Sequence, residues 1–186
     1  MAEERVFKKV DFTLRPLSEV EYEGSIFTGC TFISAVLSGK RFSDCLFDGC
    51  DLTLAVMANT VWNNARFVNC KLLGLNFNAC SQLLFSVEFE GCMMKLSAFH
   101  KMKLRKTRFM NCDLQEADFT ETDLTSAVFE SCDLQRAIFF HSILEKADFR
   151  TAFNYTIDPE QNRMRNARFS ASGVAGLLDK YHIVIE

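Results

Sequence analysis

A five-residue repeat runs through most of this chain and restricts what it can fold into. Each unit reads small, polar, large apolar, polar, polar, as in Cys112–Glu116, and sixteen of the nineteen phenylalanines occupy the large position. A period of five fits neither the 3.6-residue turn of an α-helix nor the two-residue alternation of a β-strand. Strict self-similarity at a short period is typical of a solenoid, in which each unit buries its apolar residue only against neighbouring units.

A second period, of twenty residues, lies on top of the first. Like residues recur at this spacing in three series: Phe89, Phe109, Phe129, Phe149 and Phe169; Leu104, Leu124 and Leu144; Cys30, Cys50 and Cys70. Four units per period imply a coil with four sides. Coils about 4.8 Å apart, the spacing of any β ladder, would stack identical side chains in dry internal columns. The sequence thus predicts an all-β, four-sided coil.

The composition indicates one domain with its own core. Of the 186 residues, 48% are hydrophobic, and the two prolines and eight glycines do not cluster into a linker. No N-terminal segment combines a basic start with an apolar run, and no stretch approaches eighteen apolar residues. We therefore expect a cytoplasmic protein that does not enter a membrane.

The eight cysteines could by their even number indicate disulfides or a zinc site. Each one, however, occupies the small position that alanine fills in other units, and no Cys-x-x-Cys occurs. We interpret them as buried free thiols that act as small hydrophobes. Lys40 also occupies a small position, where burying a charge is unfavourable, so we expect a distorted coil and a side chain that reaches outward.

The register slips once, because Phe77 and Phe89 are twelve residues apart instead of ten. Two extra residues must lie near 82–86, as a bulge or a kink, and we expect no projecting loop there. We therefore divide the chain into a repeat solenoid over residues 1–169 and a C-terminal element over residues 170–186.

The C-terminal element is predicted to form a short helix and a strand. The spacing of an amphipathic helix is shown by Val174, Leu177, Leu178 and Tyr181. Ser172 is the candidate N-cap, and residues 183–185 form an apolar strand. Because an open last coil exposes core and unpaired backbone, this element can cap the solenoid, join two copies, or do both. The expected homodimer interface comprises Leu177, Leu178, Tyr181, Ile183 and Ile185.

The net charge is only −3, so a strongly acidic surface requires segregation of the charges. Residues 111–135 contain seven acids and neither Lys nor Arg. Since residues twenty apart stack, several acids acquire a cation: Glu21 with Arg41, Asp51 with Lys71, Glu121 with Lys101, Asp123 with Lys103, and Glu116 with Arg136. The acids without a stacked cation are the candidate partner-binding residues: Asp113, Asp118, Glu130 and Asp133.

Two interpretations of this acidic band remain open. It is either a solvated face of the fold or a binding surface for a cationic partner. Asp113 and Asp133 are twenty residues apart and so stack on each other, a like-charge contact that fold stability alone would not favour.

No pattern indicates catalysis, a cofactor or a metal. His100, His141 and His182 have no cysteine or serine placed as a nucleophile–base pair, and there is no glycine-rich phosphate loop. A metal site needs convergent His, Cys or carboxylate groups, which the repeat does not supply. The one basic run, residues 101–108, lies mostly against acids, which argues against direct nucleic-acid binding. We expect a non-enzymatic protein with a protein partner.

The repeat over about residues 5–149 resembles that of the pentapeptide-repeat family, which implies a right-handed quadrilateral β-helix. Within that family, the segments Ile157–Arg163, Gly176–Ile185 and Leu84–Phe89 resemble the microcin immunity proteins that protect DNA gyrase. More distantly, the chain is similar to the Qnr quinolone-resistance proteins. Members of this subgroup are rod-shaped dimers joined through their C-termini; they act on type II topoisomerases and are regarded as mimics of duplex DNA.

Two functional hypotheses follow. The resemblance implies a DNA-mimic-type protein that binds DNA gyrase or topoisomerase IV and protects it from a quinolone or a peptide toxin. The alternative is a stiff interaction scaffold for some other cytoplasmic partner. About seven coils would form a rod of about 33 Å, over which duplex DNA carries on the order of twenty phosphates. With a net charge of −3, only a segregated acidic surface could imitate DNA.

Overall fold

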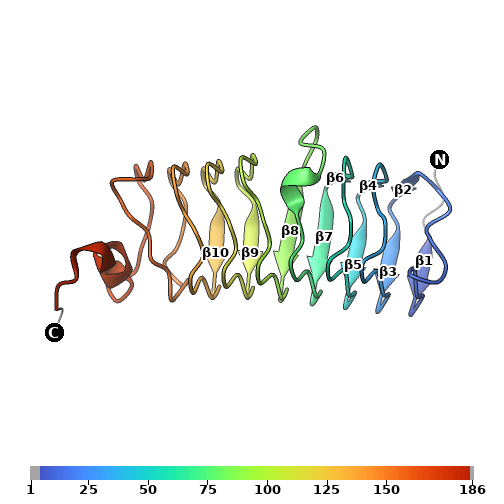
Figure 1. Ribbon diagram of the computed structural model, residues 1–186, viewed down its shortest axis with the longest axis horizontal. Coiled ribbons are helices and arrows are strands. Elements are labelled where there is room, and N and C mark those ends of the chain that lie inside the picture. Colours follow the sequence, from blue (N-terminus) through green and yellow to red (C-terminus); the bar gives the residue numbers. More distant parts are fainter. Residues whose placement is uncertain (1–4, 185–186) are drawn as a thin grey trace.

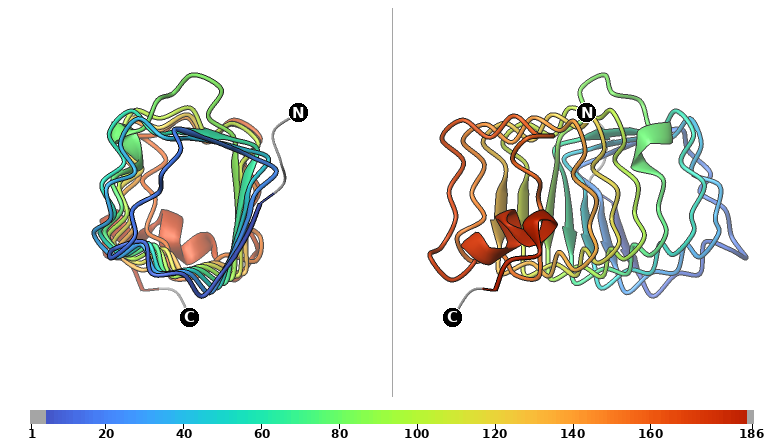
Figure 2. Two further views of the ribbon diagram at one scale, coloured as in Figure 1. Left: turned by 90° about the vertical axis from the view of Figure 1, so that its right-hand side faces the viewer. Right: turned by 60° about the vertical axis from the view of Figure 1, so that its left-hand side comes forward.

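The protein is a straight rod built from one continuous coil, as shown by a computed structural model that describes residues 5–184 (Figure 1). Viewed along its axis, the coil has a square outline, with the chain running round four faces (Figure 2). The N-terminus lies at one end of the rod and the C-terminus at the other. The predicted right-handed quadrilateral β-helix is confirmed.

Parallel ladders connect each coil with the next. A seven-stranded sheet has the order β1-β3-β5-β7-β8-β9-β10, and a three-stranded sheet the order β2-β4-β6. The strands are β1 (Val6–Lys8), β2 (Glu21–Glu23), β3 (Ile26–Thr28), β4 (Arg41–Ser43), β5 (Leu46–Asp48), β6 (Val61–Asn63), β7 (Ala65–Val68), β8 (Val87–Glu90), β9 (Arg108–Met110) and β10 (Val128–Glu130). Paired residues are twenty apart, as in Phe109 and Phe129, which is the period read from the sequence.

The four faces are named here in chain order. The first face carries the seven-stranded sheet. The second carries single bridges such as Asp113 to Asp133, and the third carries bridges such as Asp118 to Ile138. The fourth carries β2, β4 and β6, and further along the rod the bridge from Lys103 to Asp123.

The core consists of columns of stacked rings. Phe129 lies parallel to Phe109 and Phe149, with ring centroids 5.0 Å and 4.7 Å away, and meets Phe119 edge-on at 5.7 Å. These separations fall in the favourable range for aromatic pairs. The last column member, Phe169, is stacked on Phe149 at 5.2 Å, so the coil continues beyond the regular repeats as expected.

The small position of each unit satisfies backbone carbonyls inside the rod. Its thiol or hydroxyl donates to the carbonyl of the large residue twenty-three positions earlier, as in Cys50 to Phe27 (3.2 Å), Thr60 to Leu37 (2.9 Å) and Ser142 to Phe119 (2.8 Å). A buried carbonyl without a partner would be costly, so a small donor is favoured there. This role explains why Cys, Ser and Thr occur at a position where alanine satisfies only the requirement for a small side chain.

Lys40 performs the same role with a longer side chain. Its ammonium donates to the carbonyls of Leu17 (3.0 Å) and Glu19 (2.6 Å) in the preceding coil. The Lys40 side chain is half-buried, and these two carbonyls hold and solvate its charged group.

The register slip forms a projecting loop. β7 pairs with β8 at an offset of twenty-two residues, Phe67 with Phe89, where other strands are offset by twenty. The extra residues extend a loop after the 3-10 helix η1 (Phe77–Ala79), and this loop stands out from the rod at its middle (Figure 1). The expectation of no projecting loop is therefore wrong. Leu83 and Leu84 lie at its tip and are exposed.

The C-terminal element contains no α-helix within the described residues. It has two short 3-10 segments, η2 (Val174–Leu177) and η3 (Asp179–Tyr181), and residues 183 and 184 are not in a strand. Ser172 does not cap η2; Gly173 precedes it and donates its N–H to Ser170 Oγ. The predicted amphipathic α-helix is therefore wrong, since the short helical segments are of the 3-10 type; the predicted strand is not formed at residues 183 and 184, and Ile185 lies outside the described residues.

Substitution of one core ring tests the column. Phe129→Ala removes a fully buried ring between two stacked neighbours, and we expect a loss of about 3–5 kcal/mol in the free energy of unfolding. The control Phe140→Ala removes a ring that is 45% exposed and should change it by less than about 0.5 kcal/mol. Chemical denaturation measures both. Equal losses would show that the columns do not carry the stability.

The buried thiols should resist labelling in the native protein. All eight cysteines are free and buried, as predicted. Burial raises the pKa of Cys45 to about 11 and that of Cys80 to about 12, so the reactive thiolates are scarce at neutral pH. A maleimide followed by mass spectrometry should modify the cysteines only in denaturant. Rapid labelling of native Cys112 or Cys132 would contradict the register.

Docking of the C-terminal element onto the last coil should depend on pH. Lys180 Nζ lies 2.7 Å from Asp158 Oδ1 and 2.6 Å from Glu160 Oε2, and these bonds lower the pKa of both carboxyls and raise that of Lys180. Lowered carboxyl pKa values stabilise the docked state above about pH 4, and this contribution is lost as pH falls through the lowered values. The protection factors of the amides of residues 170–184, which correct for the slower intrinsic exchange in acid, should therefore be lower at pH 3 than at pH 7.

The control for this pH effect is Lys180→Met, which removes the cation and keeps a long apolar side chain. In this variant the protection factors of residues 170–184 should be low already at neutral pH and should change little on acidification. A wild-type protein whose tail is equally protected at pH 3 and pH 7 would show that the ion pairs do not hold the tail.

Candidate partner-binding surface

The four candidate acids do not form one surface. Asp113 and Asp133 bridge each other on the second face. Asp118 belongs to the third face, and Glu130 ends strand β10 on the first. Only Asp113 and Asp133 are brought together, because four faces share each turn of twenty residues. A run of acids in the sequence is therefore distributed around the rod.

The aspartates have a local structural role that their spacing did not reveal. Eight of them accept a hydrogen bond from the backbone N–H two residues later, in the Asx-turn arrangement. The pairs are Asp11 with Thr13, Asp51 with Thr53, Asp113 with Gln115, Asp118 with Thr120, Asp123 with Thr125, Asp133 with Gln135, Asp148 with Arg150 and Asp158 with Glu160. The recurrence of Asp at this point of the unit thus serves the turn that follows it.

The contact between Asp113 and Asp133 is relieved by neighbouring polar groups. Lys95 Nζ lies 3.4 Å from Asp113 Oδ2. Asp133 accepts hydrogen bonds from Gln115 Nε2 at 2.7 Å and Asn154 Nδ2 at 3.0 Å. The inference that Asp113 has no cation is wrong, because a long side chain eighteen residues earlier, not twenty, reaches it.

Asp118 and Glu130 retain their charge without an ion pair among residues 5–184. Asp118 accepts only the Thr120 N–H, at 2.8 Å, and is half-buried. Glu130 is exposed beside a hollow that Val128 and Arg150 also line. Of the four candidates only Glu130 is exposed, while Asp118 is half-buried like Asp113 and Asp133.

Four of the five predicted ion pairs between coils are confirmed. The separations are 3.2 Å for Arg41–Glu21, 3.8 Å for Lys71–Asp51, 3.6 Å for Lys101–Glu121 and 3.8 Å for Arg136–Glu116. All are largely solvated, so each is worth about 0–1 kcal/mol. The cations of these four pairs partly neutralise the charge of Glu21, Asp51, Glu121 and Glu116, whereas Asp118 and Glu130 have no such cation.

The fifth predicted pair, Lys103 with Asp123, is wrong. Asp123 bonds instead to Arg105 Nε at 2.6 Å and to the Thr125 hydroxyl at 2.6 Å. Burial alone would raise the pKa of Asp123, but these bonds keep it below its ordinary value. Asp123 binds Arg105 in preference to Lys103 because the planar guanidinium forms a directed, charge-assisted hydrogen bond with the carboxylate.

The predicted dimer residues differ in accessibility. Leu177 and Leu178 are half-buried, and Leu177 packs against the core of the rod. Tyr181 and Ile183 are more than half exposed, and the Tyr181 hydroxyl donates to Glu160 Oε1 at 2.9 Å. Ile185 lies outside the described residues. The tail thus presents apolar surface at one end of the rod.

The described residues contain no group of three or more His, Cys, Asp or Glu arranged to hold a metal ion. No helix in the described part of the chain is long and apolar enough to cross a membrane.

Comparison with known proteins agrees with the geometry of the coil. The family descriptions "Pentapeptide repeat region" and "Pentapeptide repeats (8 copies)" match residues 82–153 and 25–60, together more than half of the chain. The chain belongs to the pentapeptide-repeat family. No curated protein matches it.

Solved structures of QnrB1, described as a plasmid-mediated fluoroquinolone resistance protein, have the same fold. One trypsin-treated variant of QnrB1 is 17% identical, with 98% of each chain covered and a TM-score of 0.52. A second trypsin-treated variant is 19% identical, with 98% of this chain and 91% of that one covered and a TM-score of 0.50. At these identities the similarity establishes the fold.

One surface feature was missed by reading the sequence. Apolar residues gather on the third face near the N-terminal half of the rod, where Leu54 and Leu96 are exposed. The signal was available as two long runs without charge, residues 52–65 and 72–87. It was overlooked because those runs also contain the buried members of the repeat.

Proposed function

We propose that this protein binds a type II topoisomerase, DNA gyrase or topoisomerase IV, and protects it from a quinolone or a peptide toxin. The observation that carries the proposal is a fold shared over 98% of both chains with a fluoroquinolone resistance protein. The resemblance of the C-terminal segments to microcin immunity proteins supports it. The proposal requires no chemistry from the chain and places it in the cytoplasm, where these enzymes act.

The charge distribution fits electrostatic steering toward the enzyme by a few acids that have no ion pair better than it fits a close imitation of the phosphates of DNA. Asp118 and Glu130 carry uncompensated charge, and Asp113 and Asp133 add two carboxylates whose charge is shared with neighbouring polar groups. They lie on three adjoining faces, so a saddle that wraps round the rod can meet all four. Long-range attraction of this kind raises association rates and weakens with salt.

Neutralising the four candidate acids should weaken binding. Asp113→Asn, Asp118→Asn, Glu130→Gln and Asp133→Asn together change the net charge from −3 to about +1 and keep an acceptor for each Asx turn. We expect the affinity for gyrase to fall at least about tenfold at low salt, and less at high salt. Supercoiling by gyrase with a fluoroquinolone or microcin, with and without the protein, provides the functional readout.

A matched control neutralises four acids that already have a cation. Glu21, Glu116, Glu121 and Glu145 are salt-bridged, and their change to Gln alters the net charge equally. This variant should bind and protect almost as the wild type does. Equal losses in both variants would indicate that net charge alone matters. A wild-type protein that does not touch either topoisomerase at low salt would favour the alternative, a scaffold for another partner.

We further propose that the tail joins two copies into a dimer through Leu177, Leu178, Tyr181, Ile183 and Ile185. Exposed apolar residues at the end of a rod are suited to a two-fold contact. Leu178→Asp should prevent the two tails from associating, so that sedimentation no longer detects this dimer. Asp179→Asn serves as a control that leaves the contact intact. If the Leu178→Asp variant and the wild-type protein sediment identically, the assignment of the dimer contact is contradicted.

A further inference from the structure

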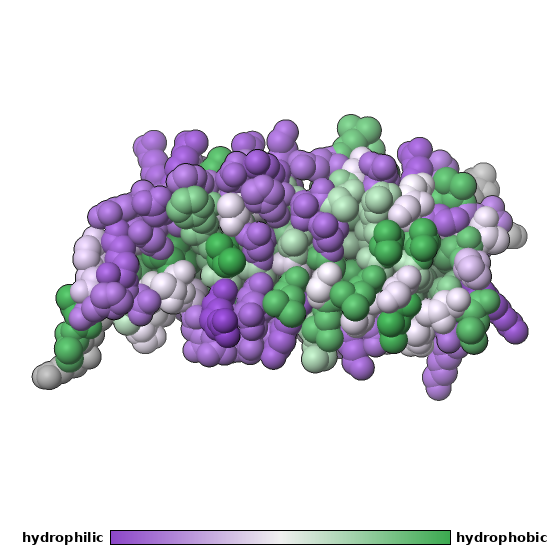
Figure 3. All heavy atoms as spheres, viewed as in Figure 1, coloured by the Kyte–Doolittle hydropathy of each residue, from purple (hydrophilic) through white to green (hydrophobic). Residues whose placement is uncertain are grey.

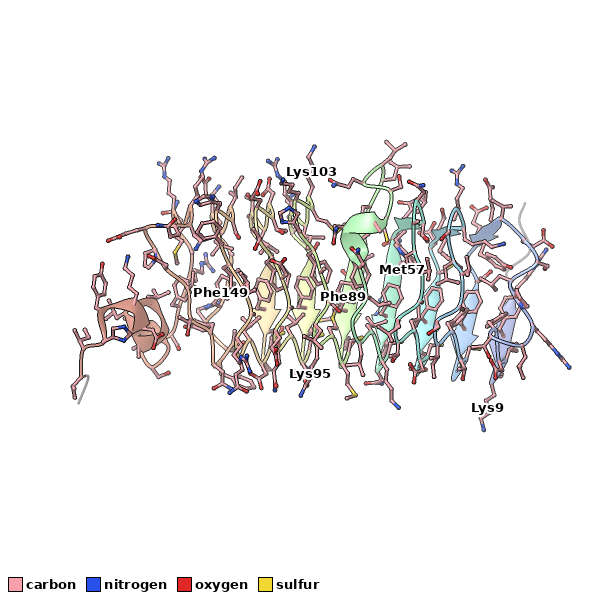
Figure 4. The ribbon with its side chains drawn as sticks, viewed as in Figure 1. Lys9, Met57, Phe89, Lys95, Lys103 and Phe149 are labelled. Atoms are coloured by element: carbon pink, nitrogen blue, oxygen red, sulfur yellow. The ribbon has the colours of Figure 1, made fainter. Side chains whose placement is uncertain are left out.

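Positive charge gathers on the fourth face over the half of the rod nearer the C-terminus. Four successive coils form this area, here called the basic surface: residues 101–106, 121–126, 141–146 and 161–166. Bridges join each coil to the next through Lys103, Asp123, Ile143 and Arg163. The basic surface contains seven cations and three acids. Figure 3 shows hydrophilic side chains along this edge of the rod, where Figure 4 shows Lys103 pointing outward.

The three acids of the basic surface are already neutralised by cations. Their ion pairs are Asp123 with Arg105 at 2.6 Å, Glu145 with Arg163 at 2.7 Å, and Glu121 with Lys101 at 3.6 Å. The other four cations form no ion pair among residues 5–184, and all are exposed: Lys103, Lys106, Lys146 and Arg165. Since the Debye length at physiological ionic strength is about 8 Å, a ligand at this face responds mainly to these four cations and little to the net charge of the chain.

The sequence argued against nucleic-acid binding because residues 101–108 were predicted to lie mostly against acids. Among residues 5–184, only two of the five cations in that run have an ion pair, Lys101 and Arg105. Arg105 occupies the carboxylate that the spacing assigned to Lys103. Lys103 is thereby left free to contact a ligand.

Between the cations, most outward side chains are small hydrogen-bonding groups: Thr125, Ser126, His141, Gln161 and Asn166. Ile143, which is half-buried, is the only apolar residue at an outward position of the basic surface. Lys, Arg, Ser, Thr, Asn and Gln are the side chains that contact phosphates in protein–DNA complexes. A protein interface has an apolar centre, and a membrane-binding surface has apolar anchors. The chemistry therefore fits a phosphate backbone better than it fits an acidic protein or a lipid surface.

The four free cations form two rows across the rod. Lys103 and Lys106 lie on the first coil of the basic surface, and Lys146 and Arg165 lie on the third and fourth. The second coil, residues 121–126, contains no Lys or Arg. With coils about 4.8 Å apart, the two rows are separated by about 10–14 Å along the rod. Two such rows, on long flexible side chains, suit the two phosphate rows that border the minor groove of a duplex, which is about 6 Å wide.

We propose that the basic surface binds the backbone of duplex DNA, which crosses the rod with one minor groove over residues 121–126. The projecting loop stands beside the first cation row, where Gln82 Nε2 donates to the Lys101 carbonyl at 3.3 Å. It blocks a duplex from running along the rod toward the N-terminus, so the duplex crosses the rod. Because the contacts are made to phosphates, binding is independent of base sequence.

The opposite charges of this half of the rod lie on different sides. The four candidate acids are on the first, second and third faces, whereas the basic surface is on the fourth. The rod can therefore meet DNA on one side and a cationic protein on the others. DNA binding by the basic surface does not require the proposed function, and its test uses no topoisomerase.

Fluorescence anisotropy of a short labelled duplex of arbitrary sequence tests the proposal. With four phosphate contacts, the logarithm of the association constant should fall with the logarithm of the salt concentration at a slope of about −3.6. The test variant changes the four free cations to Asn, which tolerates the positive φ of Lys106 and Lys146. At about 50 mM salt its affinity for the duplex should be at least about tenfold lower, and its salt dependence should nearly vanish.

A matched control changes four exposed cations outside the basic surface to Asn, so that the net charge changes equally: Lys8, Lys9, Arg15 and Lys71. This variant should bind the duplex almost as the wild type does. Both variants should melt at the temperature of the wild type, because all eight side chains are exposed.

Three results would overturn the proposal. The first is a wild-type protein that does not bind the duplex at about 100 μM protein and about 50 mM salt, where non-specific DNA binding is readily detected. The second is an equal loss of affinity in the two variants, since the location of the cations would then be irrelevant. The third is competition by polyglutamate as effective as that by unlabelled duplex, which would show that any polyanion satisfies the surface.

The place of binding has a separate readout, because the eight native cysteines are buried and leave an introduced thiol as the site of labelling. An environment-sensitive dye on Ser126→Cys lies between the two cation rows, and one on Gln135→Cys lies on the second face. Addition of duplex should change the emission of the first dye and leave that of the second unchanged. A change at Gln135→Cys with none at Ser126→Cys would show that DNA binds elsewhere and would contradict the assignment.

Discussion

Stacking of large side chains at a spacing of twenty residues is the interaction on which the structure depends. Most phenylalanines of the core lie flat on the ring one coil before them and meet a neighbouring column edge-on, as Phe129 does with Phe109 and Phe119. Parallel pairing of such short strands is weak alone, since each strand is only three or four residues long. The columns hold successive coils in register, and the ladder hydrogen bonds then follow.

This constraint explains both what the sequence predicted and where it failed. Positions inside the coil repeat with one period, so the fold, the buried thiols and the aromatic columns could be read directly. Side chains outside the coil are not bound by that period. Lys95 reaches Asp113 from eighteen residues away, and Arg105 displaces Lys103 at Asp123. The tail, which has no repeat, adopts 3-10 turns in place of the helix that its spacing indicated.

The four faces allow one small rod to present different chemistry in different directions. Figure 4 shows Lys103 and Lys95 pointing away from opposite faces, while Phe89 and Phe149 point into the coil. The third face is apolar near the N-terminus, and Asp118 lies on it further along the rod, so one flat side carries two kinds of surface. A solenoid separates these surfaces because a change in one coil's outward residue leaves the core column intact.

The proposed function requires that the coils of residues 111–135 meet the topoisomerase. Hydrogen exchange of the protein alone and in complex with gyrase tests this most directly, since it reports contact at every turn without altering a residue. The account predicts slower exchange at the turns after Asp118 and Glu130 in the complex, and unchanged exchange at the buried columns. A complex in which residues 111–135 exchange as in the free protein would contradict it.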